Sequence, residues 1–139
     1  MPDFNCYLTF DGTCAAAMRF YERVLGGKIT LMMTNGESPM AAQIPPGNAD
    51  RIMHVRLAFD GGVLMASDSM AGQPYAGMQG FSLALAYTNT ADAKHVFDAL
   101  VEGGKVTMPL QKTFWAEAFG MLVDRFGTPW MINAGMANS

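Results

Sequence analysis

The chain has 139 residues and a formal net charge of −3, and half of its residues are hydrophobic while only 15% are charged. Nine basic residues are scattered among 12 acidic ones without forming a basic stripe, so we expect no nucleic-acid partner. No apolar run approaches the roughly 18 residues of a membrane span, so we expect no membrane partner either.

The first half of the chain predicts a strand, a helix and three more strands. Apolar residues spaced by three and four over 16–25 indicate the helix, with Thr13 as its N-cap and Gly26-Gly27 as its end. The strands are predicted at 5–10, 28–33, 51–59 and 63–67. The stretch 35–50 contains three prolines, and we predict a mobile loop near the mouth of a cavity.

The second half predicts the same order of elements. A helix with Thr90 as its N-cap and an apolar face over 93–101 ends at Gly103-Gly104. A closing β-hairpin follows, because Asp124 and Gly127 supply turn residues between two apolar runs. The strands are predicted at 81–87, 105–110, 119–123 and 130–133.

The two halves form an internal repeat with a constant offset of 77 residues. The offset relates Thr13 to Thr90, Ala16 to Ala93, Phe20 to Phe97 and Val24 to Val101, and it also relates the Gly-Gly-Lys sequences that follow the two helices. We therefore predict an α+β fold in which two tandem βαβββ modules form a curved, cup-shaped mixed sheet with the helices outside. The modules are 1–70 and 81–135, joined by a connector at 71–80 within a single domain, 1–139.

This plan resembles the vicinal oxygen chelate superfamily, which includes glyoxalase I, extradiol dioxygenases, and the fosfomycin and bleomycin resistance proteins. Residues 20–26 (FYERVLG) are similar to the first helix of that superfamily. Residues 113–116 (TFWA), 119–120 (FG) and 124–133 (DRFGTPWMIN) resemble its PhnB-like branch, whose members often carry a 3-demethylubiquinone methyltransferase-like label. The glycine-rich strand–turn–helix that a methyl donor needs is not apparent in the sequence.

Metal-dependent members of the superfamily hold their ion with four ligands, usually His and Glu, on four strands. The resemblance carries those places over to Asn5 or Cys6, Met65, Ser82 and Met131. Thioether and hydroxyl groups suit common divalent ions poorly, so we expect no metal, no other cofactor and an uncharged ligand. The alternative is a metal-dependent enzyme whose ligands have shifted to His54, Cys6 or Asp68.

The remaining candidates each have two interpretations. His54 shares a strand face with Arg56 and is either a pocket base or hydrogen-bond donor, or a solvent-facing residue, whereas His95 is expected on a helix surface. Asp68 is either a turn cap or a catalytic acid. Aromatic and methionine side chains either contact a ligand or fill the core. The predicted pocket comprises Cys6, His54, Met65, Ser67, Ser82, Trp115, Phe119, Met131 and Asn133.

These observations favour a protein that binds a small apolar or aromatic molecule in the cup without a catalytic metal. A metal-dependent enzyme and a structural dimer whose cups are filled by its own side chains remain alternatives. The resemblance and the exposed sheet edges also predict a homodimer. Cys6 and Cys14 show no disulfide spacing, and the N-terminus shows no signal pattern, so we expect a cytoplasmic location. The sequence names neither a substrate nor a reaction.

Overall fold

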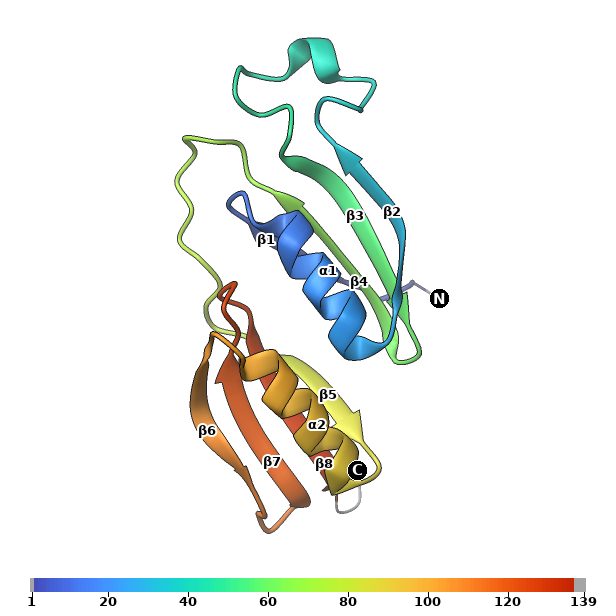
Figure 1. Ribbon diagram of the computed structural model, residues 1–139, viewed down its shortest axis with the longest axis vertical. Helices are drawn as coiled ribbons and strands as arrows, with labels where there is room; N and C mark the ends of the chain where they lie inside the picture. The colour runs from blue at the N-terminus through green and yellow to red at the C-terminus, as the bar shows by residue number, and fades with distance from the viewer. Residues whose placement is uncertain (1, 137–139) are drawn as a thin grey trace. The chain divides into compact units, whose positions relative to one another are not determined.

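The computed structural model describes residues 2–136 and divides the chain into two compact units, Met1–Ala76 (unit 1) and Gly77–Ser139 (unit 2). The division falls inside the stretch 71–80 that the sequence predicts as a connector. Within the described residues, each unit folds as a four-stranded mixed sheet with one α-helix on one of its faces (Figure 1). The predicted α+β fold with two tandem βαβββ modules is therefore confirmed.

Unit 1 forms a sheet in the order β1-β4-β3-β2, in which β1 and β4 are parallel and the other neighbours are antiparallel. Helix α1 packs on β2, β3 and β4, and the core lies between them. A short 3-10 helix, η1 (Ala41–Gln43), lies between β2 and β3. The main elements are β1 (Cys6–Phe10), α1 (Cys14–Leu25), β2 (Lys28–Thr34), β3 (Ile52–Phe59) and β4 (Gly62–Asp68).

Unit 2 repeats this topology in the order β5-β8-β7-β6, with β5 and β8 parallel. Helix α2 packs on all four strands, and its buried face is Ala93, Val96, Phe97 and Leu100. The elements are β5 (Leu83–Tyr87), α2 (Thr90–Val101), β6 (Lys105–Gln111), β7 (Ala116–Val123) and β8 (Pro129–Met136).

The offset of 77 residues holds for the first two strands of each unit, but the helices are related by an offset of 76. Asn89, rather than the predicted Thr90, is the N-cap of α2, and its side chain accepts a hydrogen bond from the Asp92 amide at 2.8 Å. The burial pattern agrees, because Ala17 and Ala93 are buried whereas Ala16 is exposed. Phe20 and Phe97 are both buried as predicted.

The predicted closing hairpin is present, and Asp124 holds its turn together. One carboxylate oxygen of Asp124 accepts hydrogen bonds from the amides of Phe126 and Thr128, at 2.8 and 3.1 Å. The other oxygen accepts from the indole Nε1 of Trp130 at 2.8 Å, and Trp130 itself is buried in the core of unit 2. The sequence DRFGTPW, which resembles the PhnB-like branch, therefore has a structural role, because its Asp124 and Trp130 hold this turn together.

The loop between β2 and β3 is anchored at its base by buried amide side chains. The Nδ2 of Asn35 donates to the backbone oxygen of Asn48 at 3.0 Å, and Asn48 Oδ1 accepts from the Ala71 amide at 2.7 Å. Both asparagines are buried. Buried polar groups that find partners in this way restrain the two ends of the loop. The mobility of the segment between the two asparagines stays a prediction.

Candidate functional site

Each sheet has a face that its own helix covers and an opposite face, called here the open face. In unit 1 the alternating core residues of β1, β3 and β4 point toward α1, for example Leu8, Val55 and Leu64. Since strand side chains alternate between faces, the intervening residues lie on the open face. That face carries Tyr7, Thr9, Leu31, Met33, His54, Arg56, Met65 and Ser67.

Tyr7 and His54 form a pair on this open face. The Tyr7 hydroxyl lies 3.1 Å from His54 Nδ1, and the two rings stack with centroids 5.7 Å apart and planes at 28°. The two strands that carry them, β1 and β3, flank β4, so the rings lean toward each other above β4. Tyr7 remains 49% exposed, so the pair is accessible. Sequence reasoning singled out His54 but missed Tyr7, although the alternation from Leu8 and Phe10 would have placed Tyr7 on this face.

Arg56 lies two residues from His54 on the same strand face and is exposed. Its Nη1 lies 3.5 Å from the Thr30 hydroxyl, at the limit of a hydrogen bond. It forms no ion pair with any residue that the structure describes. The carboxylates of unit 1 that form recorded contacts do so with groups other than Arg56. These carboxylates belong to Asp11, Glu22, Glu37 and Asp68.

The open face of unit 2 is more apolar. Phe119 and Met121 on β7 are register partners of Asn133 and Met131 on β8, and Ala84 on β5 pairs with Met131. The opposite face of β7 belongs to α2, because a Cβ on Gly120 would lie 2.8 Å from the Phe97 ring. The Trp115 ring packs edge-on against Phe119, with centroids 5.3 Å apart.

Asn133 is the polar group on the open face of β8. Its residue is only 7% exposed, and its amide has no hydrogen-bond partner among the described residues. None of its side-chain nitrogen or oxygen atoms is fully buried without a partner, so the amide tip reaches the surface. An amide in this position offers both a donor and an acceptor to a bound molecule.

The other predicted pocket residues divide by strand parity. Met65 and Ser67 on β4 and Met131 on β8 lie on open faces. Ser82 directly precedes β5 and is partly buried. Cys6 has the parity of Leu8 and Phe10, so its alternation directs it to the helix-covered face, and its pocket position is corrected in favour of its neighbour Tyr7.

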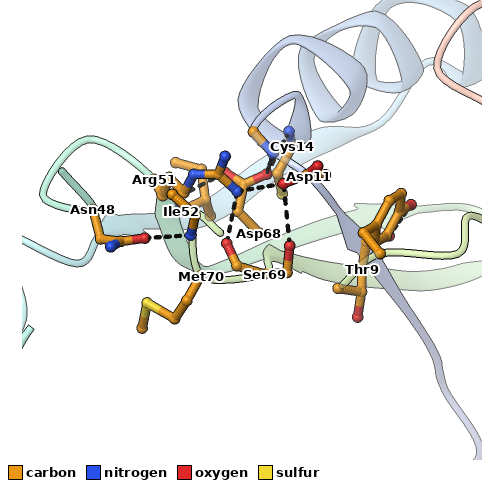
Figure 2. Close-up of polar contacts among 12 residues, drawn as sticks. Thr9, Asp11, Cys14, Asn48, Arg51, Ile52, Asp68, Ser69 and Met70 are labelled. Carbon is orange, nitrogen blue, oxygen red and sulfur yellow. Dashed lines mark hydrogen bonds and ion pairs between the residues drawn. The ribbon is translucent and has the colours of Figure 1, made fainter. Parts of the chain in front are cut away.

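Asp68 is the acceptor of a backbone network at one end of the unit 1 sheet (Figure 2). Its Oδ1 accepts from the amides of Gly12 and Cys14 at 2.8 and 3.0 Å, and its Oδ2 accepts from the Ile52 amide at 2.9 Å. Thr13 occupies the N-cap position of α1 without a side-chain capping bond. Asp68, at the end of β4, instead accepts the hydrogen bond from the first amide of the helix, that of Cys14. The carboxylate joins α1, β3 and β4 and is used structurally.

Arg51 completes the same network. Its Nη1 donates to Asp11 Oδ1 and to the backbone oxygen of Ser69, both at 2.8 Å (Figure 2). The side chain of Arg51 is largely buried, so the contact ties the β1–α1 turn to the chain that follows β4. These bonds give the polar cluster in Figure 2 a structural role.

The donor set does not fit the metal that the fold family implies. No group of three or more His, Cys, Asp or Glu side chains suited to an ion occurs among residues 2–136. Of the three shifted ligands considered from the sequence, Asp68 is bonded to three backbone amides and Cys6 alternates toward the helix side. His54 is thus left as a single nitrogen ligand, whereas catalytic zinc sites use three protein ligands.

Both thiols are held in their neutral form. Burial raises the pKa of Cys14 to about 12, with a further contribution from the negative charge of Asp68, and burial also raises the pKa of Cys6. A thiol with a raised pKa is a poor nucleophile near neutral pH, because little thiolate is present. Neither cysteine therefore has the environment of a catalytic thiol.

Two sheets of this topology, each backed by one helix, define a vicinal-oxygen-chelate-type protein. The family model of the Glyoxalase/Bleomycin resistance protein/Dioxygenase superfamily matches residues 4–132, and the chain belongs to this superfamily. Neither described α-helix has the length and apolar character that crossing a membrane requires.

Three relatives refine this assignment. Protein YjdN of Escherichia coli (strain K12) is 37% identical over 135 residues, covering 91% of each chain. The crystal structure of protein PA1353 from Pseudomonas aeruginosa has 43% identity and a TM-score of 0.90, covering 97% of this chain and 98% of that one. The PhnB protein from Bacillus cereus, whose description carries a 3-demethylubiquinone-9 3-methyltransferase label, shares the fold with 23% identity and a TM-score of 0.81, covering 96% and 100%. The superfamily expected from the sequence is therefore confirmed, and the PhnB protein shares its fold.

Proposed function

We propose that this protein binds a small molecule with an apolar or aromatic body on its open sheet faces, without a catalytic metal. The observation that carries the proposal is the composition of those faces. Methionine and aromatic side chains recur on them, at Tyr7, Met33, Met65, Phe119, Met121 and Met131. Among the described strand positions, side chains of a type that commonly binds divalent ions occur there once in each unit, as His54 in unit 1 and as Glu117, which alternates with Phe119, in unit 2. Flexible thioethers adapt to ligands of irregular shape, and aromatic rings stack on planar ones.

A few polar groups among these apolar side chains support a binding role. Small-molecule sites are mostly apolar and contain a small number of polar groups that fix orientation. Tyr7 with His54 in unit 1 meets this description at an accessible position, and Asn133 in unit 2 adds an amide that is 7% exposed. The methyltransferase label belongs to the Bacillus cereus relative and is not carried over to this chain.

Binding of the neutral fluorescent dye Nile red, together with elemental analysis, tests the proposal. Protein purified without affinity nickel or chelator is expected to bind the dye with about one site per chain. It is also expected to contain well under one equivalent of zinc, nickel, manganese, iron or copper. A stoichiometric metal that is lost in His54→Ala would favour the metal-dependent enzyme instead. Failure to bind any apolar probe would favour a structural dimer.

We also propose that the protein forms a homodimer. Strand β6 is an edge of its sheet and is exposed along nearly its whole length, with Val106 and Met108 being 41% and 36% exposed. The unpaired backbone groups of an edge strand can bond to those of a second copy of the chain. Light scattering coupled to size-exclusion chromatography is expected to give about twice the 15.0 kDa chain mass. A monomer at micromolar concentration would contradict this proposal.

A further inference from the structure

We infer that Tyr7, His54 and Arg56 form a subsite for an oxyanion, so that the ligand carries a carboxylate or similar acidic group at one end. The inference rests on the proposed function, because the same open face of unit 1 would hold the apolar body of that ligand. It replaces, at this end of the site, the expectation of an uncharged ligand that the methionine positions alone suggested.

His54 presents a hydrogen-bond donor in either protonation state. In the neutral pair the phenol is the stronger donor, so the Tyr7 hydroxyl donates to Nδ1 and the imidazole proton resides on Nε2. In the imidazolium form both ring nitrogens carry protons, and the Tyr7 oxygen then accepts from Nδ1. The Nε2–H group has no partner among the described residues and is available to an acceptor on a ligand.

Arg56 supplies the second donor and the positive charge. It is two residues from His54 on one strand face, which places the two Cα atoms about 7 Å apart, within reach of one small acid. Its guanidinium is a planar fork that matches the two oxygens of a carboxylate. Only the 3.5 Å contact with the Thr30 hydroxyl uses that fork among the described residues.

The surroundings favour an acid over other ligands. None of the strand positions on this open face is occupied by Asp or Glu, so no carboxylate of the face competes for Arg56 or repels an anion. Leu31 and Met65 are the register partners of Arg56, and Met33 is the partner of His54. An acid bound at the cluster would thus have an apolar shelf on either side for the rest of its structure.

Benzoate and its neutral analogue benzamide test the inference, because they share size and ring but differ in charge. We expect the wild-type protein to bind benzoate at least about tenfold more tightly than benzamide, which is the usual size of a charge-assisted contact. In Arg56→Met this preference should fall to about one. His54→Phe retains an aromatic ring beside Tyr7 and should lower the preference several-fold.

Arg19→Met is the matched control. Arg19 is an exposed residue of α1, on the other side of the sheet, and its recorded side-chain contact is with the Met32 sulfur at 3.4 Å. The Arg19→Met substitution removes the same charge and the same type of side chain as Arg56→Met, but on the helix side of the sheet. The preference for benzoate should therefore be retained in this variant. Each variant is compared at an equal fraction of folded protein, verified by its melting temperature.

Nile red separates this inference from the function on which it rests. If the wild type binds the dye but prefers benzoate no more than benzamide, the acid-binding subsite is wrong while the proposed function stands. Equal loss of preference in Arg19→Met and Arg56→Met would also overturn the subsite, because it would assign the effect to net charge. If neither the dye nor an aromatic probe binds, the proposed function fails as well.

Discussion

Unit 1 and unit 2 share one topology, but their open faces differ in chemistry. The strand registers make Phe119 the counterpart of His54, Met121 the counterpart of Arg56, and Ala84 the counterpart of Tyr7. All three polar residues of unit 1 thus correspond to apolar residues in unit 2. The pairs on the helix-covered faces, such as Leu57 and Leu122, are buried in both units. The repeat has therefore kept its packing positions, while the open faces have diverged toward hydrogen bonding in one unit and aromatic contact in the other.

The turn chemistry shows a second contrast between the units. In each unit one aspartate accepts three hydrogen bonds that close a junction. Asp68 bonds three backbone amides, from the β1–α1 turn, α1 and β3, whereas Asp124 bonds two amides and the indole of Trp130. The two residues are not equivalent in the repeat, because Asp68 ends β4 whereas Asp124 follows β7. Each unit therefore uses an aspartate at a different position to hold its elements together.

The largest effect is expected where the helix of unit 2 meets its sheet. Phe97→Ala should lower the free energy of unfolding by about 3–5 kcal/mol, because it removes a buried ring that lies over Gly120. Urea unfolding followed by tryptophan fluorescence measures it, since both tryptophans belong to unit 2. His95→Ala, at an exposed position on the same helix, is the control. A loss below about 1 kcal/mol for Phe97→Ala would contradict the assigned helix face.

The two aspartates should have similar energetic weight despite their different partners. Asp68→Asn and Asp124→Asn should each cost about 2–3 kcal/mol, because an amide replaces one acceptor oxygen with a donor that opposes an N–H group. Chemical denaturation measures both variants, and Asp60→Asn in an exposed turn should change stability by less than about 0.5 kcal/mol. An unchanged free energy of unfolding in Asp68→Asn would contradict the structural role and favour the alternative interpretation of Asp68 as a catalytic acid.

Alkaline pH should destabilise unit 1, where both cysteines lie, while unit 2 contains one tyrosine, Tyr87, whose pKa burial also raises. The Cys14 pKa is raised from 9.0 to about 12, so above pH 9 the unfolded thiol ionises while the folded one stays neutral. The stabilisation is complete below pH 9 and is lost as pH rises from 9 toward 12, at up to about 1.4 kcal/mol per pH unit. Denaturation at pH 8 and pH 10.5 should show this slope in the wild type. Its persistence unchanged in Cys14→Ala would assign it to other groups.

The smallest effect on stability is expected for the Tyr7–His54 pair. Tyr7→Phe removes one accessible hydrogen bond and should cost about 1 kcal/mol or less. The informative measurement is the nitrogen NMR spectrum of the imidazoles, in which the wild-type His54 should show its proton on Nε2, a preference that Tyr7→Phe should weaken. His95→Gln assigns the signals, because the chain has two histidines. Identical His54 spectra in wild type and Tyr7→Phe would show that the pair does not form in solution.

The sequence by itself determined the order of the elements and the module plan. Apolar spacing marks the helices and strands, and the glycines and aspartates mark the turns. These signals are local and recur in both units, at an offset of 77 residues in the first two strands and 76 in the helices. The family resemblance was also readable, and the structure gives the motif around Asp124 and Trp130 a physical basis in the closing turn.

Only the tertiary structure decided which side chains share a face and which distant groups meet. Strand side chains alternate with a period of two, so an error of one residue exchanged Cys6 for Tyr7 at the candidate site. The N-cap of α2 was predicted at Thr90 and is Asn89 in the structure. Both residue types are common N-caps, so the sequence alone did not distinguish them, whereas the backbone geometry does. Tyr7 and His54 are 47 residues apart, and strand pairing through β4 is what brings their rings together, which no local pattern encodes.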